Sequence, residues 1–268
     1  MFKNNKINGL FFLVILLISS ACSNFNKVVK SNDSEYKYKK AIEYYESGQY
    51  SKASTLLSQI VTIYRGTSRA DEIYFYYGKS LFALGDNLNA GHWFNTLIRE
   101  FPKSKRGEES QFMVGYCYYM QSPKPRLDQT VTKKAIDAFQ LYLNIFPMSD
   151  RLEECNSLIA ELQDKLVYKT YLTGILYYDL GNYRAATIAL ANSLKRYPDT
   201  KYREVLAFRL LESKYNLAIF STSDKKELRL SDALDEYYAF IDEFPNSKYK
   251  RLAERYHRDT AKLLNYDN

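Results

Sequence analysis

Four short segments of one kind constrain the fold of this chain more than any other feature. In each of them an aromatic residue stands before proline, and a serine or threonine stands two residues after it. Proline ends a preceding helix because the residue before it is driven out of the α region, and a hydroxyl side chain can accept from the first N–H groups of the next helix as an N-cap. We therefore expect one helix to end and another to begin at residues 100–104, 145–149, 196–200 and 243–247.

An acidic residue follows the hydroxyl residue by four positions in most units. Glu108, Glu153 and Glu204 occupy this place after the prolines, and residues 67–71 repeat the spacing one unit earlier. The last unit has Arg251 in the acid's place. Because the helix macrodipole favours negative charge in a first turn, we expect these acids, and the carboxylate pairs to which Glu108 and Glu153 belong, to be solvated partners of the dipole.

Upstream of each proline the sequence fits a pair of helices of the 34-residue tetratricopeptide repeat. A small residue recurs where the two helices of a pair would cross, since a small side chain lets two backbones approach closely. Turns between the paired helices are expected at Gly48, Gly85 and Gly181. The crossing residues are Ala41, Gly78, Gly115, Gly174 and Ser213, and the second helices contain Ala53, Ala90, Ala135, Ala186 and Ala233.

The spacing between successive prolines is longer than one such repeat. We assign the excess to loop insertions at 121–130 and 221–226 and to a long first helix from Asp150 to Leu180, which carries no glycine or proline before Gly174. Glycine and proline are scarce, with 10 and 6 residues, which argues against a turn-dense β fold. We predict an all-α fold, a solenoid of about five tetratricopeptide-like helix pairs with a C-terminal capping helix after Arg251.

The first residues of the chain have the form of a targeting segment. Lys3 and Lys6 precede an apolar run that ends at Ile18, and small residues then lead to Cys22. Such an arrangement forms a secretory signal, and the run is shorter than the ~20 residues that a spanning helix needs. We assign 1–21 to a signal peptide, 22–34 to a lipidated tether, 35–149 to repeats 1 to 3, and 150–268 to the linking helix, repeats 4 and 5 and the capping helix.

The end of this segment, residues 18–22, resembles a bacterial lipobox, in which the cysteine is acylated and becomes the first residue. The resemblance implies a lipid anchor at Cys22 with palmitate among its chains, and more than one chain gives stable attachment. Ser19 departs from the motif, which usually has an aliphatic residue there. Ser23 resembles the outer-membrane sorting pattern of such lipoproteins. An ordinary secreted protein with a chance cysteine is the alternative.

Patterns that would indicate catalysis or metal binding are scarce. His92 and His257 each lack a cysteine or second histidine at metal-ligand spacing, and Cys117 and Cys155 are expected to fill core space as small hydrophobes. The sequence has no phosphate-binding loop and no hydrolase or metalloprotease signature. The formal charge of +7 is spread without a basic cluster or stripe, which argues against nucleic acid as a partner. We expect no enzyme, no cofactor and no metal.

Aromatic residues are abundant, with 26 Tyr and 15 Phe. Tyrosine doublets at 44–45, 118–119 and 177–178 fall at the same place in their repeats. Adjacent helical residues point about 100° apart, so that one member packs within the repeat and the other faces the concave surface of the first helices, where aromatic residues mark partner sites. The alternative is that neighbouring repeats or insertions cover this surface. The candidate residues are Tyr38, Ile42, Tyr45, Phe75, Phe82, Phe112, Tyr116 and Tyr119.

The lipobox, about five tetratricopeptide units and the recurring aromatic-proline segments together resemble the BamD family of outer-membrane assembly lipoproteins. The resemblance covers essentially the whole mature chain, and residues 177–186 through 196–200 are its most specific stretch. It implies a periplasm-facing subunit, anchored by lipid in the outer membrane, of the machine that folds β-barrels into that membrane.

The same resemblance implies the partners. The C-terminal repeats would hold the periplasmic domains of the barrel-forming protein, with Tyr183, Arg184, Lys195 and Arg196 as candidate contacts, and the N-terminal repeats would receive unfolded outer-membrane protein segments. Two other classes stay open. One is a periplasmic tetratricopeptide adaptor for cell-wall synthesis or division. The other is a surface nutrient-binding lipoprotein, for whose ligand-binding region the short insertions leave no room.

Overall fold

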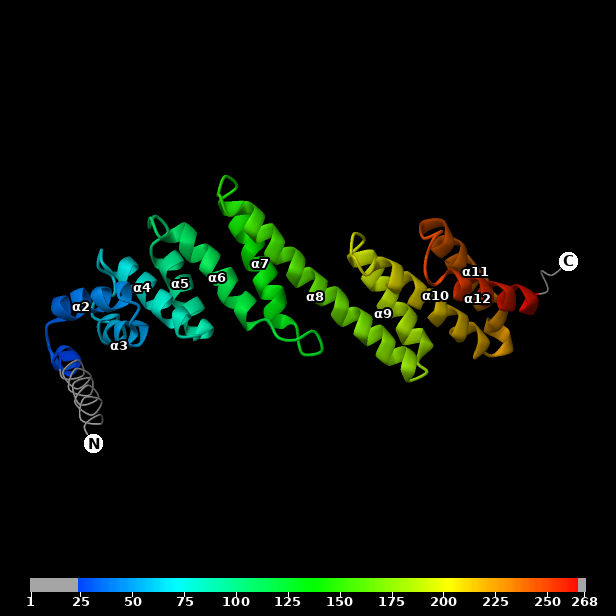
Figure 1. The fold of residues 1–268 in the computed structure, drawn as a ribbon, viewed down its shortest axis with the longest axis horizontal. Coiled ribbons are helices and arrows are strands. Elements are labelled where there is room, and N and C mark those ends of the chain that lie inside the picture. Colours follow the sequence, from blue (N-terminus) through cyan, green and yellow to red (C-terminus); the bar gives the residue numbers. More distant parts are fainter. Residues whose placement is uncertain (1–23, 265–268) are drawn as a thin grey trace, which may run out of the picture. The chain divides into compact units, whose positions relative to one another are not determined.

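The structure is a computed structural model that describes residues 24–264, and within this range every regular element is a helix. Residues 24–30 form a short helix ahead of the repeats. The helices that follow are α2 (Ser34–Glu46), α3 (Tyr50–Ile60), α4 (Ala70–Ala83), α5 (Asn87–Glu100), α6 (Gly107–Gln121), α7 (Thr130–Ile145), α8 (Leu152–Asp179), α9 (Tyr183–Arg196), α10 (Arg203–Ile219), α11 (Ser223–Glu243) and α12 (Lys250–Leu263) (Figure 1). The predicted all-α fold is confirmed.

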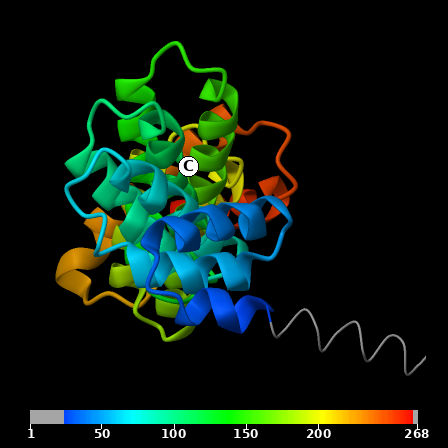
Figure 2. The same cartoon turned by 90° about the vertical axis from the view of Figure 1, so that its left-hand side faces the viewer.

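The chain divides into two compact units. The first consists of the residues up to Ser122 together with 130–156, and the second of 123–129 together with the residues from Ser157 onward. In the first unit, successive helices from α2 to α7 pack against one another, and Figure 2 views this unit from the end where α2 and α3 lie. In the second unit, α10 packs against α9, α11 and α12. The predicted long helix is α8, which is continuous over 28 residues.

Glycines stand where the paired helices cross, as predicted. A Cβ atom added at any of three of them would lie less than 3 Å from a fully buried side chain of the second helix. No side chain larger than hydrogen fits at this separation, because ordinary carbon contacts need about 3.5–4.0 Å. The distances are 2.9 Å from Gly78 to Phe94, 2.7 Å from Gly115 to Phe139 and 2.6 Å from Gly174 to Leu190.

The turns within the helix pairs are also where the sequence predicts them. Gly48, Gly85 and Gly181 have φ angles of 73°, 81° and 72°, in the left-handed region that glycine adopts without steric cost. The side chain of Asp86 then caps α5, and the side chain of Asn182 caps α9, each by accepting an N–H group three residues later at 3.2 Å. Each glycine therefore ends one helix immediately before the cap of the next.

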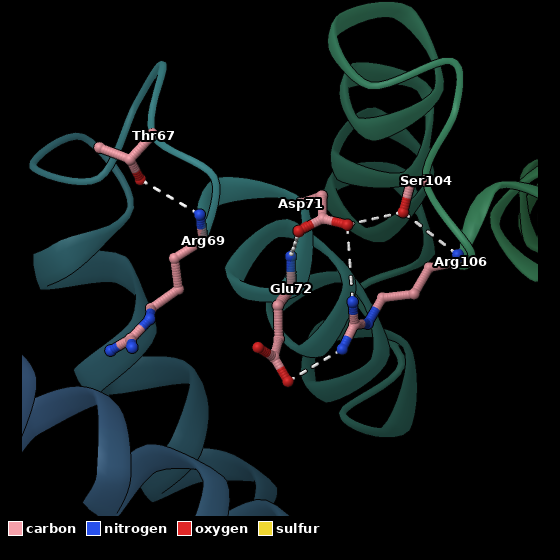
Figure 3. A network of polar contacts seen from close by, with 6 residues as sticks. All are labelled: Thr67, Arg69, Asp71, Glu72, Ser104 and Arg106. Atoms are coloured by element: carbon pink, nitrogen blue, oxygen red, sulfur yellow. Dashed lines mark hydrogen bonds and ion pairs between the residues drawn. The ribbon is translucent and has the colours of Figure 1, made fainter.

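The hydroxyl residues after the prolines are not helix N-caps, contrary to prediction. α6 begins at Gly107, and its N-cap residue is Arg106, whose side chain caps no N–H group. Ser104 Oγ accepts the N–H of Arg106 at 3.1 Å and donates to Asp71 of the preceding repeat at 2.7 Å. The Arg106 guanidinium lies 3.5 Å from the Asp71 carboxylate and 2.9 Å from that of Glu72 (Figure 3). The hydroxyl thus links two repeats.

The same link recurs in other repeats and gives the first-turn acids a role that the sequence did not predict. Ser247 Oγ donates to Glu204 at 2.6 Å. The Tyr142 hydroxyl donates to Glu108 at 3.0 Å and lies 2.6 Å from that of Ser149. These carboxylates are therefore not merely solvated partners of the helix dipole, since they accept hydrogen bonds from the following repeat or from the end of their own. Their position on the first turn brings them beside the loop that joins the two.

Two segments differ from their predicted form. The insertion after α6 is a loop as expected, held by Gln129, but residues 223–226 form the first turn of α11 and not a loop. They contain no glycine or proline, so nothing interrupts the helix. Residues 24–30, expected in the tether, are helical; Val28 is buried, and the ring of Phe25 lies 5.6 Å from that of Tyr44.

α12 closes the described part of the second unit with one buried side. Ala253 and Tyr256 belong to a cluster with Phe208 of α10 and Phe240 of α11. The buried Tyr256 hydroxyl donates to Glu212 at 2.8 Å. Because burial and this hydrogen bond both favour the neutral phenol, the pKa of Tyr256 is raised. The apolar side of α12 is therefore fully used in packing.

Candidate partner-binding surfaces

Half-buried aromatic side chains of α2, α4 and α6 meet one another across the first unit. The rings of Tyr45 and Tyr76 lie 4.9 Å apart, those of Phe82 and Tyr116 lie 5.7 Å apart, and Tyr116 stacks on Tyr119 at 5.6 Å. Each of these residues keeps part of its surface exposed, as does Ile42 one turn before Tyr45. We call this set the aromatic face; it consists of Ile42, Tyr45, Tyr76, Phe82, Tyr116 and Tyr119.

Two of the predicted surface residues are wrong. Phe75 and Phe112 are buried, with exposed fractions of 8% and 3%. An arginine from the next inter-repeat loop covers each ring, Arg106 at 5.9 Å and Arg151 at 4.2 Å from the ring centroids. A guanidinium over an aromatic ring is a favourable cation–π contact. The alternative of cover by the neighbouring repeat is therefore correct for this position.

Tyr38 of α2 occupies the same place in the first repeat and stays half-buried. Arg69 lies 4.9 Å from its ring centroid. Burial, followed by a hydrogen bond to Glu72, raises the pKa of Tyr38, so that its hydroxyl stays a neutral donor. Tyr38 thus belongs to the covered position, although its cover is less complete than that of Phe75.

The covering residues follow a signal that the sequence carries but that the search for motifs missed. They stand two positions after the hydroxyl residue in every unit: Arg69, Arg106 and Arg151, and then Tyr202 and Tyr249. Tyr249 stacks on Phe208 at 4.3 Å, and Tyr202 lies 5.7 Å from Tyr168. Because arginine and tyrosine both cover a ring with a flat group, the rule concerns shape and not residue type.

The electrostatics of the aromatic face favour neutral hydrogen-bond donors. Burial, with smaller contributions from Tyr50 and Glu109, raises the pKa of Tyr45. Lys79 on α4 lies between Ile42 and Tyr116 in the repeat order, and its ammonium pairs with Glu109 at 2.8 Å. The face therefore offers rings and hydroxyl groups, with this nearby charge already paired.

The predicted contacts of the second unit fall at the two ends of α9. Tyr183 stacks on Phe220 at 5.6 Å with 13° between the ring planes, and Arg184 beside it is exposed. Lys195 and Arg196 are exposed at the other end of the helix, eleven or more residues later, which corresponds to about 17 Å. The structure therefore does not bring the four residues together.

Exposed apolar side chains surround the Tyr183 end of α9 and were not predicted. Phe220 keeps 72% of its surface exposed, and Leu180 keeps 71%. Both are large hydrophobic residues next to a helix terminus, where the sequence pattern alone does not distinguish cover from exposure. Together with Tyr183 and Arg184 they form what we call the α9 patch.

The described residues offer no sign of catalytic chemistry. Cys117 and Cys155 are buried free thiols, as expected. Burial raises the pKa of Cys117 to about 12 and, with help from Glu154, that of Cys155 to about 11. Between residues 24 and 264 no group of histidine, cysteine and carboxylate side chains could hold a metal ion. His257 stacks on Tyr237 at 4.4 Å.

The membrane anchor predicted at Cys22 lies outside the described residues. In the part of the chain that the structure covers, no helix combines the length and the apolar character needed to cross a bilayer. Taken with the paired helices and the two surfaces, these features define the class of protein: a helical-repeat scaffold that binds other proteins.

Comparisons with known proteins agree with this class. The model of a family described as YfiO, outer membrane lipoprotein, matches residues 30–228. The putative outer membrane protein assembly factor BamD of Aquifex aeolicus (strain VF5) is 23% identical over 245 residues, which are 90% of this chain and 79% of that protein. A thermophilic TPR protein of Thermus thermophilus matches at 16% identity, 84% and 98% coverage and a TM-score of 0.34. A Podosopora anserina putative kinesin light chain with TPR-like repeats gives 15%, 80%, 96% and 0.34.

Because the family model spans most of the chain, the protein belongs to the YfiO family of outer membrane lipoproteins. The family resemblance stated from the sequence is thereby confirmed. Membership associates the protein with the outer membrane and with a role in outer-membrane assembly. It is a scaffold or adaptor and not an enzyme.

Proposed function

We propose that the protein is a periplasm-facing scaffold of the machine that assembles β-barrel proteins in the outer membrane. The observation that carries the proposal is the family match over residues 30–228, which includes residues of both units. The similarity to a putative assembly factor of Aquifex aeolicus supports it. In this role one surface binds the barrel-forming subunit and another binds unfolded substrate segments.

The lipid anchor at Cys22 is part of the proposal. Acyl chains each contribute about 0.8 kcal/mol per buried methylene group, and two or more chains hold a protein stably at a bilayer. Replacing Cys22 by alanine should leave a product without acyl chains. Mass spectrometry of the mature N-terminus tests this directly, and an unmodified start at Ser23 in the wild-type protein would refute lipidation.

The aromatic face is the proposed site for unfolded outer-membrane protein segments. Tyrosine supplies a large contact area at low cost in conformational entropy, and its hydroxyl can bond to the unpaired backbone of an extended chain. Strands of outer-membrane barrels alternate apolar and polar residues and carry aromatic girdles. Their apolar side chains can therefore stack on rings such as Tyr45, Phe82 and Tyr119 while their backbone meets the hydroxyl groups.

The test of this site replaces two residues of the aromatic face together. Tyr45→Ala with Tyr119→Ala should reduce photocrosslinking of a synthetic barrel-strand peptide and leave binding of the barrel-forming partner near the wild-type level. Tyr36→Ala with Tyr238→Ala removes two exposed tyrosines outside the face and is the matched control. If the face variant melts far below the control and loses both activities, these tyrosines serve packing and the proposal for this site fails.

The α9 patch is the proposed site for the periplasmic domains of the barrel-forming partner. Interface cores are enriched in aromatic side chains and arginine, and this patch combines Tyr183, Arg184 and Phe220. Lys195 and Arg196 at the other end of α9 would act as rim charges, which mainly change the association rate and its salt dependence.

Affinity capture from detergent-solubilised membranes tests the function as a whole. A tagged full-length chain should recover the barrel-forming protein, and Arg184→Glu with Phe220→Ala should reduce that recovery. Lys133→Glu with Lys134→Glu on the exposed side of α7 is the control and should leave it unchanged. Recovery of cell-wall synthases without any barrel-forming protein would overturn the assignment in favour of a cell-wall adaptor.

A further inference from the structure

Four positively charged side chains form a row along α12. Arg251, Arg255, Arg258 and Lys262 follow the spacing i, i+4, i+7, i+11, which at 100° per residue places them within an arc of about 60°. All four are exposed, and the buried side of the helix, with Tyr256 at its centre, faces the opposite way. We call this row the basic stripe. The expectation that the chain has no basic stripe is therefore wrong.

The basic stripe forms no ion pair in the described structure. No carboxylate among residues 24–264 lies within ion-pair distance of any of the four side chains. Like charges one helical turn apart destabilise a helix, and the stripe contains three such neighbouring pairs. A solvated face needs no single sign of charge, because interspersed charges keep a surface soluble. Solubility alone therefore does not account for the stripe.

The place of Arg251 in the repeat strengthens the argument. In earlier repeats the equivalent residue is a carboxylate, and Asp71 and Glu204 each accept a hydrogen bond from the loop of the next repeat. At this position α12 presents a cation instead. Whatever packs against this end of α12 must therefore supply an anionic group where the other repeats supply a donor.

We propose that the basic stripe is a docking surface for an acidic segment of another protein, one that presents carboxylates along about 17 Å. Three of the four cations are arginines, whose planar fork binds carboxylates in a bidentate manner, and arginine is enriched at protein interfaces whereas lysine is depleted. The proposal does not rest on the α9 patch or on the aromatic face.

Other anionic occupants fit the surface less well. A helix that binds a lipid surface buries its apolar side in the membrane, but here Ala253 and Tyr256 are already packed against α10 and α11. Proteins that bind single-stranded nucleic acid interleave cations with exposed aromatic rings, whereas Tyr256, the aromatic residue beside Arg255, is buried. Both occupants remain distinguishable by experiment.

The test uses the full-length chain in detergent and a synthetic helical peptide of about 18 residues with four glutamates at the spacing of the stripe. A peptide of identical composition with the glutamates spread around the helix is the control ligand. Fluorescence anisotropy should show the ordered peptide binding several-fold more tightly than the control peptide, with an affinity that falls as salt is raised. Arg251→Glu with Arg258→Glu should weaken it by about tenfold.

Two controls separate the proposal from simpler causes. Lys133→Glu with Lys134→Glu changes net charge equally at exposed positions of α7 and should stay within about twofold of wild type. Reversing Arg251 and Arg258 converts the three like-charge pairs of α12 into opposite-charge pairs, so this variant should melt no lower than wild type. If it does melt lower, Arg255→Gln with Lys262→Gln takes its place and should weaken binding in the same direction.

Four results would overturn the proposal. Equal losses in the two charge-reversed proteins would mean that only net charge matters, and equal binding of the two peptides would remove the role of spacing. Tighter binding to phosphatidylglycerol vesicles than to the peptide would indicate a lipid surface. A dimer in light scattering that Arg251→Glu with Arg258→Glu dissociates would indicate that the occupant is a second copy.

Discussion

Replacing Gly115 by alanine tests whether the helix crossings determine the packing of the first unit. The added Cβ would lie 2.7 Å and 2.8 Å from the Cδ1 and Cε1 atoms of Phe139, a fully buried residue. Ordinary carbon contacts are about 3.5–4.0 Å, so the ring or α6 must shift by about 1 Å. The ring is also held from the side, because it lies 5.8 Å from that of Phe112.

The expected change in the free energy of unfolding is the sum of two opposing effects. Overpacking of this kind costs about 1–3 kcal/mol, whereas alanine is favoured over glycine in a helix interior by about 1 kcal/mol. Gly115→Ala should therefore lose about 0–2 kcal/mol. Gly107 supplies the matched control, because it begins the same helix and nothing lies within 4 Å of an added Cβ. Gly107→Ala should gain up to about 1 kcal/mol.

Urea and thermal unfolding of the two alanine variants measure the difference, which should be about 1–3 kcal/mol, and each kcal/mol corresponds to about 2–4 °C at this size. Adding Phe139→Leu to Gly115→Ala should cost less than the sum of the single changes, because the smaller side chain leaves room for the new methyl group. Equal melting of the two alanine variants, or additivity of the pair within about 0.5 kcal/mol, would refute the reasoning.

Three further predictions concern the links between repeats, the tyrosines and the thiols. Ser104→Ala removes the hydrogen bond to Asp71 and should lose about 1–2 kcal/mol in urea unfolding, whereas Ser231→Ala on the exposed side of α11 should lose almost nothing. Burial, and then the charge of Glu212, raises the pKa of Tyr178 to about 12 from its usual value of about 10. The folded state therefore binds more protons between these values, and stability should fall as pH rises from about 10 to 12; a melting temperature equal at both ends would contradict this. Cys117 and Cys155 should resist maleimide until urea unfolds the chain, because burial keeps both thiols protonated, and rapid labelling of the native protein would show that they are accessible.

The helix pairs could be predicted from the sequence because their signals are local. Gly85 followed by Asp86 gives a left-handed turn and then a helix cap within two residues, and both properties belong to the residues themselves. The crossing glycines are nearly as local, since a small residue at a fixed place in a repeat has few other causes. Chain segments of this kind keep their conformation whatever packs around them.

The cover of Phe75 and Phe112 could not be predicted in the same way. It depends on loop arginines about 30 to 40 residues later, whose side chains reach back over the preceding helix. The role of Ser104 is non-local for the same reason, because its hydroxyl chooses between capping α6 and donating to Asp71 according to where the preceding helix lies. In both cases the sequence supplies the correct residue types, and the contact between neighbouring repeats decides what they do.

These contacts also explain why the proposed surfaces occupy different halves of their helices. In α4 the loop of the next repeat covers the first two turns, where Asp71 and Phe75 lie, and leaves Phe82 near the end of the helix on the aromatic face. A partner of the aromatic face therefore meets the C-terminal halves of first helices. No described loop covers the start of α12, so Arg251 stays exposed there. A partner of the basic stripe can therefore reach the N-terminal half of α12 as well as its end.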